Sequence, residues 1–199
     1  MINDLNTMIK ATYADKGLVL DILTKSFENN KSVNYVIQQN HKKFRRIYEL
    51  MDYSFEQCYL FGEIYLSDDR KACALILYPH QKTTSLKTIK LDFKLLFHTI
   101  RLKNISKTLK RESKIKHIQP KTNMLYLWFI GVDPKCQYTG LGTKLLKELM
   151  DYAQLQQLPV YLETSAIQNL PWYKKHGFQL YHQLDLSYKL HFLKKELIA

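Results

Sequence analysis

The stretch from Leu125 to Thr164 constrains the fold of this chain more than any other part of its sequence. Residues 125–132 are an uninterrupted run of mostly apolar and aromatic side chains, which predicts a strand buried on both faces of a sheet. An apolar stripe of helical period runs from Leu141 to Ala153, and residues 159–164 predict a second strand. A strand, helix, strand unit crosses over with a right hand and makes its strands parallel. We therefore expect an α/β domain built around a central parallel pair.

The remaining segments are expected to extend this unit into one domain. The chain has 199 residues and 46% hydrophobic content, enough for one substantial core, so we expect a single domain over residues 1–199. Helical periodicity predicts one helix that begins near Asp15 and another over 44–55. The predicted outer strands are residues 8–12, a hairpin of 58–66 with 73–78, and a closing pair of 178–181 with 185–192.

Composition excludes several classes of protein. No apolar run approaches the roughly 20 residues that span a bilayer, so no membrane partner is expected. Met1 to Asn6 lack the basic flank and apolar run of a secretory signal, which predicts a cytoplasmic protein. Three widely spaced cysteines predict reduced thiols, and none of the seven histidines pairs with another at helical metal spacing. We therefore expect no metal site.

Positive charge is concentrated between residues 81 and 121, where twelve basic residues face only Asp92 and Glu112. Periodicity predicts two helices here, interrupted near 103–106, and then a loop up to Lys121. Three interpretations stay open: a solvated helical face, attraction of a polyanion such as nucleic acid, and electrostatic steering of an anionic ligand. Because few aromatic side chains alternate with the basic ones, nucleic acid is the less favoured partner.

A glycine-containing loop joins the central strand to its helix over residues 132–143. Gly140 and Gly142 lie where the helix begins, and a helix start offers unpaired amides and a positive dipole end to an anion. A Walker loop is excluded, because no glycine lies five residues before Gly142. A dinucleotide fingerprint gains support from Glu163, about 20 residues further on, but Leu145 stands where its third glycine is required.

The residues Gln137, Gly140 and Gly142 match the Gln/Arg-x-x-Gly-x-Gly/Ala loop of the GNAT superfamily of N-acetyltransferases. The stretch 161–178 also resembles, in order and spacing, the puromycin-acetyltransferase-like branch of that superfamily. The resemblance covers about residues 124–186. It implies the GNAT fold, an α/β fold with a mixed, mostly antiparallel sheet of about six to seven strands, a splayed central parallel pair and helices on both faces. It places a coenzyme-binding core at about 124–190.

The resemblance also implies a reaction, the transfer of an acetyl group from acetyl-CoA, as co-substrate, to a primary amine in a ternary complex without metal. The acceptor is a small-molecule amine or a protein amine. The alternative is a non-catalytic acyl-CoA-binding or nucleic-acid-associated module. By resemblance, one strand pairs with the pantetheine arm, with an oxyanion donor near Ile130 and a bulge at Gly131, and loop amides hold the pyrophosphate. The implied contacts are Phe129, Ile130, Gly131, Val132, Gln137, Tyr138, Thr139, Gly140, Leu141, Gly142 and Thr143.

Three further side chains are candidates for the chemistry. Tyr173 occupies the position of the superfamily's general acid and is also expected to contact the coenzyme; its alternative role is a packed aromatic. Asn169 is a helix N-cap, a coenzyme contact or both, at the start of a short helix that Gly177 is expected to end. Glu163 is the candidate general base, and its alternative role is a hydrogen bond or ion pair at the end of the sheet.

Overall fold

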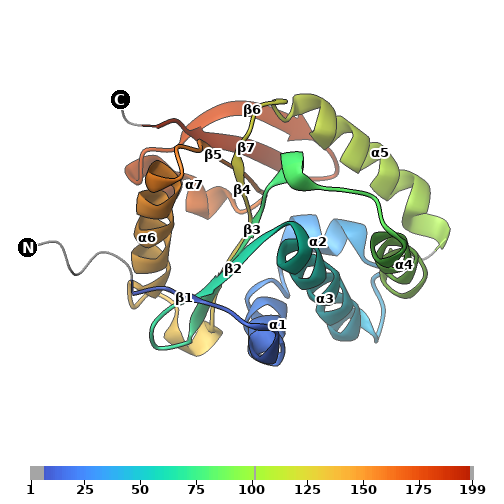
Figure 1. Cartoon of the computed structure of the whole chain (residues 1–199). Coiled ribbons are helices and arrows are strands. Elements are labelled where there is room, and N and C mark those ends of the chain that lie inside the picture. The colour runs from blue at the N-terminus through green and yellow to red at the C-terminus, as the bar shows by residue number, and fades with distance from the viewer. Residues whose placement is uncertain (1–6, 101, 198–199) are drawn as a thin grey trace, which may run out of the picture.

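The computed structural model describes residues 7–100 and 102–197. Seven strands form one sheet in the order β1-β2-β3-β4-β5-β7-β6, in which only β4 and β5 run parallel (Figure 1). The expected mixed, mostly antiparallel sheet is therefore confirmed. The strands are β1 (Ile9–Lys10), β2 (Gly62–Leu66), β3 (Ala72–Leu77), β4 (Leu125–Val132), β5 (Val160–Thr164), β6 (Gln179–Asp185) and β7 (Lys189–Lys195).

Helices cover both faces of the sheet (Figure 1). On one face, α6 and α7 pack over an apolar cluster that includes Leu146, Leu149 and Leu162. On the other face, α1 and α3 bury Leu23 and Phe55 against the sheet, while α5 covers β7 and β6. The helices are α1 (Lys16–Ser26), α2 (Lys31–Val36), α3 (Lys43–Phe61), α4 (Leu86–Lys94), α5 (Leu102–Ile118), α6 (Leu141–Leu155) and α7 (Leu170–Lys175).

Two predictions made from periodicity are wrong. The strand expected from Cys58 begins only at Gly62, because α3 continues to Phe61 and buries Cys58 in the core. The interruption expected near 103–106 does not occur, since α5 is helical from Leu102 to Ile118; the irregularity lies upstream, in a π-helical turn over Leu95–Ile100. The short helix α2 was not predicted.

The hairpin of β2 with β3 and the parallel crossover from β4 through α6 to β5 are confirmed. The prediction of a cytoplasmic protein rests on the absence of a secretory signal in Met1 to Asn6, and these residues lie outside the described part of the chain. Within 7–100 and 102–197, none of the helices combines the length and the apolar character needed to cross a membrane.

Candidate active site

The parallel strands β4 and β5 pair over only two residues before they diverge. Leu125 lies opposite Val160 and Tyr126 opposite Tyr161, and no further pairs follow. The register between β4 and β3 shifts at the same level, since Leu75 opposes Phe129 but Ile76 opposes Leu127. The extra residue is Trp128, so the bulge expected at Gly131 lies three residues earlier. Beyond the bulge, the edge of β4 that faces β5 has no strand paired to it.

Gly131 has a different role, which is to let α1 approach β4 closely. A Cβ added at Gly131 would lie 2.9 Å from Cδ2 of Leu23 and 3.2 Å from Oγ of Ser26. The Ser26 hydroxyl is within hydrogen-bonding distance of two carbonyl oxygens, those of Ile22 and Val132, each at 2.7 Å. The half of β4 that does not pair with β5 is therefore held against α1, on the face of the sheet opposite α6.

The loop before α6 is shaped to leave the helix start open. Tyr138 and Gly140 both have positive φ, +64° and +91°, and α6 begins at the next residue, Leu141, without a side-chain cap. By helix geometry, the amides of Leu141, Gly142 and Thr143 have no intrahelical acceptor. Uncapped first-turn amides and the positive end of a helix dipole suit a pyrophosphate, so these residues fit the expected coenzyme.

Helix α7 is attached to this same helix start. The indole Nε1 of Trp172 donates to Oγ1 of Thr143 at 2.9 Å, so the first turn of α6 and α7 are fixed to each other. Gly177 follows α7 with a φ of +85°, as expected for its end. Asn169 occupies the N-cap position, but its side chain makes no capping hydrogen bond, so the cap interpretation is wrong. The side chain is left free for another contact.

Tyr173 is buried in the cluster beneath α6. Its ring centroid lies 4.7 Å from that of Trp172 and 5.5 Å from that of Phe178. Among the described residues, the structure gives its hydroxyl no hydrogen-bond partner, and burial raises the pKa of the phenol. Tyr173 therefore holds a protonated hydroxyl that is available to an incoming ligand.

Glu163 is a half-buried carboxyl group in the diverging part of β5. It accepts hydrogen bonds from the hydroxyl of Tyr126 and from Nε2 of Gln119, the latter at 2.9 Å. Burial raises its pKa, while these two hydrogen bonds and the charge of Arg111 act in the opposite direction. A carboxylate with a raised pKa is a better proton acceptor, so the environment suits a base.

The two candidate catalytic groups lie on opposite faces of the sheet. Tyr173 packs with the α6 residues Leu145 and Leu149, whereas Glu163 contacts Gln119, just after the end of α5. Figure 1 shows α6 and α7 on one side of the central strands and α5 on the other. The arrangement therefore offers a proton donor on one side of the divergence and a proton acceptor on the other.

Sequence reasoning missed the partners of Glu163. Tyr126 precedes the bulge in β4 and points to the same side of the sheet as Glu163, and a parallel pairing of residue 126 with residue 161 would have indicated their proximity. Among the described residues, no group of three or more histidine, cysteine, aspartate or glutamate side chains could hold a metal ion. Cys136, near the loop, is a free thiol.

The comparison with known families bears on this same region. Residues 104–178 match the model of the acetyltransferase (GNAT) family. This central segment is similar to GNAT acetyltransferases. It contains β4, the loop, α6, β5 and α7, the elements that surround the divergence.

One curated protein that this chain resembles is an uncharacterized N-acetyltransferase of Schizosaccharomyces pombe, 38% identical over 62 residues. The aligned part is 31% of this chain and about a quarter, 25%, of the relative's length.

Solved structures resemble the whole chain. A histone acetyltransferase HPA2-related protein of Corynebacterium glutamicum aligns with a TM-score of 0.69 at 18% identity, covering 98% of both chains. The arylalkylamine N-acetyltransferase 2 of Aedes aegypti aligns with a TM-score of 0.63 at 15% identity, covering 96% of this chain and 98% of that one. The C-terminal condensation domain of Ebony, solved with β-alanyl-dopamine, aligns at 0.70 with 10% identity, covering 96% and 98%. At these identities the likeness shows the fold alone.

Proposed function

We propose that this chain is a single-domain N-acetyltransferase that moves the acetyl group of acetyl-CoA to a primary amine within a ternary complex. The observation that carries the proposal is the divergence of β4 from β5, with an open helix start beside it, a buried phenol on one face and a half-buried carboxyl group on the other. The GNAT match over the same elements supports it.

The coenzyme supplies a thioester, whose carbonyl carbon is the electrophile. Backbone groups of Phe129 to Val132 pair with its extended arm as an added strand, and the amides of residues 137–143 hold the pyrophosphate. Asn169, whose side chain does not cap α7, contributes a polar contact at the same end of the site. The amide near Ile130 donates to the oxyanion that forms during transfer.

Three proton transfers complete the reaction. Glu163 accepts a proton from the incoming ammonium, directly or through water, so that the neutral amine can attack the thioester. Tyr173 then donates its phenolic proton to the leaving thiolate, the nitrogen of the adduct loses its second proton to water as the amide forms, and Tyr173 is reprotonated from solvent. No covalent intermediate on the protein is required, and the half-buried Cys136 has no role in this scheme.

The acceptor is a small-molecule amine or a protein amine. Neighbours of both kinds share the fold: one is named for arylalkylamines, and another, from Escherichia coli, for an alanine of a ribosomal protein. The puromycin-acetyltransferase-like branch and a cytoplasmic location both remain predictions.

The variant Tyr173→Phe tests the mechanism. We expect kcat to fall by about 10²–10⁴-fold, because a positioned proton donor contributes that much. The Kd for acetyl-CoA should change little. Thiol release with a panel of amines measures turnover, and calorimetry measures binding. Tyr65→Phe, which removes another buried tyrosine hydroxyl, one that donates to Glu63 on β2 rather than facing the divergence, is the control. Unchanged turnover in Tyr173→Phe removes Tyr173 from the mechanism, and coenzyme binding by wild type without any turnover supports the non-catalytic module.

A further inference from the structure

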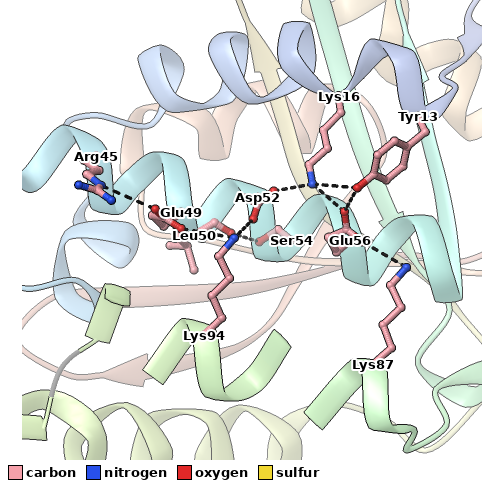
Figure 2. A network of polar contacts seen from close by, with 10 residues as sticks. All are labelled: Tyr13, Lys16, Arg45, Glu49, Leu50, Asp52, Ser54, Glu56, Lys87 and Lys94. Atoms are coloured by element: carbon pink, nitrogen blue, oxygen red, sulfur yellow. Dashed lines mark hydrogen bonds and ion pairs between the residues drawn. The ribbon is translucent and has the colours of Figure 1, made fainter. Parts of the chain in front are cut away.

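Helix α4 is attached to α3 by ion pairs between its lysines and carboxyl groups of α3. Nζ of Lys94 lies 2.7 Å from Oδ2 of Asp52 on α3, and Nζ of Lys87 lies 3.4 Å from Oε2 of Glu56 (Figure 2). The hydroxyl of Tyr53, also on α3, donates to Oδ1 of Asp92 at 2.8 Å. The contact between α4 and α3 is therefore largely polar.

Most apolar side chains of this helix face solvent instead. Three of them, together with Phe97 of the π-helical turn that follows α4, recur at helical spacing and form what we call the α4 ridge: Leu86, Ile89, Phe93 and Phe97, with exposed fractions of 81%, 40%, 55% and 56%. The rings of Phe93 and Phe97 stack with centroids 6.1 Å apart. This amphipathicity is the reverse of that of an ordinary surface helix, whose apolar stripe faces the core. An exposed apolar row of this kind marks an interaction surface.

The charge around the ridge limits what can cover it. Lys90 follows Ile89 on the same side of α4 and is exposed, whereas Lys87 and Lys94 are paired with carboxyl groups of α3. The segment 81–121 as a whole carries a net charge of +10, and most of its other basic residues belong to α5. Its two acidic side chains are both engaged, Asp92 by Tyr53 and Glu112 by Arg111. A second copy of the chain, with its own net charge of +12, would bring like charges together. The partner is therefore apolar and negatively charged.

We propose that the α4 ridge docks this protein on the surface of a membrane that contains anionic phospholipids. Basic amphipathic helices with aromatic and leucine side chains bind at the headgroup boundary, and nearby basic residues add attraction to anionic lipids. Helix α4 lies at the outer edge of the molecule, away from α6 and α7 (Figure 1), and the side chains of the ridge are exposed there. A projecting row inserts into a deformable lipid surface, whereas a partner helix is usually received in a groove.

This inference is independent of the proposed acetyl transfer. No membrane partner was expected because no apolar run is long enough to span a bilayer, but a surface contact needs only one exposed face. The ion pairs of Lys87 and Lys94 hold α4 on α3, so the ridge is already oriented before it meets lipid.

The test is cosedimentation of the full chain with vesicles. We expect wild type to pellet with vesicles of phosphatidylcholine containing about a third phosphatidylglycerol, to pellet less with phosphatidylcholine alone, and to be released by salt. The double variant Phe93→Ser, Phe97→Ser should bind the anionic vesicles at least about tenfold more weakly, which is about 1.4 kcal/mol. Lys90→Glu should weaken binding to anionic vesicles only.

The matched control removes two exposed leucines elsewhere, as Leu155→Ser with Leu180→Ser, and should bind like wild type. Because all the substituted side chains are exposed, each variant should keep the circular dichroism spectrum of wild type. Three results overturn the proposal. They are no binding of wild type to anionic vesicles, undiminished binding of the phenylalanine double variant, and a lipid-free dimer in sedimentation analysis that the same double substitution dissociates.

Discussion

Tyr126 donates a hydrogen bond to Glu163, the proposed base, and replacing Tyr126 with phenylalanine gives a quantitative test of that role. The variant removes one of the two hydrogen bonds that the carboxyl group of Glu163 accepts. A hydrogen bond to a charged group contributes about 1.5–3 kcal/mol, and one pKa unit corresponds to about 1.4 kcal/mol. Loss of the bond should therefore raise the pKa of Glu163 further, because its ionised form loses that stabilisation.

The assay is kcat/KM for an amine acceptor measured across pH. Because the base must be ionised to accept a proton, the acid limb of the profile in Tyr126→Phe should move to higher pH, and kcat/KM on that limb should fall by about tenfold or more, which corresponds to the loss of about 1.5–3 kcal/mol. Tyr161→Phe is the matched control: Tyr161 is the residue opposite Tyr126 in the parallel pair, and its ring packs on Tyr181 rather than on Glu163. An acid limb that stays in place in Tyr126→Phe, or that moves as far in Tyr161→Phe, refutes the role of Glu163.

Three further predictions concern stability. Burial raises the pKa of Glu163 above its unfolded value, so the folded chain loses stability as this carboxyl group ionises with rising pH. Glu163→Gln should therefore melt at a higher temperature than wild type at about pH 8. The difference in melting temperature should vanish near pH 4, where Glu163 is protonated. Gly131→Ala should lower the free energy of unfolding in urea by about 1–3 kcal/mol, since its methyl group would overlap Leu23. Asp52 is desolvated, but its ion pairs with Lys16 and Lys94 outweigh this and lower its pKa. Asp52→Asn should therefore lower the free energy of unfolding at neutral pH by about 1.5–3 kcal/mol. In urea titrations at acid pH, below the folded pKa of Asp52, the variant and wild type should be equally stable.

The crossover at the centre of the fold could be predicted because each of its elements has an unambiguous signal. The apolar run 125–132, the leucine stripe of α6 and the glycine at its start all agree with one another, and β4, α6 and β5 form as expected. The end of α3 could not be predicted in the same way. The residues from Cys58 to Phe61 are apolar and aromatic, a composition that suits a buried strand and the last turn of a helix equally well.

Side-chain geometry at the candidate site was less accessible to sequence reasoning. The position of Glu163 on β5 was expected, but the bonds from Tyr126 and Gln119 depend on the register of the parallel pair and on where α5 ends. The orientation of α4 depends on tertiary contacts as well. Its periodicity indicates an apolar stripe, but not which way that stripe faces. Lys87 and Lys94 pair with carboxyl groups on α3, and the apolar stripe is therefore exposed to solvent.

The short pairing of β4 with β5 has a consequence for how the protein should be handled. The edge of β4 beyond Trp128 leaves main-chain groups in the interior without a strand beside them. A ligand that lies along this edge completes the sheet and binds only the folded chain, so at 100 times its Kd it adds about 2.7 kcal/mol to the stability. The melting temperature of the purified protein should therefore rise with the fraction of molecules that have a ligand bound along this edge. A thermal shift titration can then rank acyl donors by affinity before any acceptor is known.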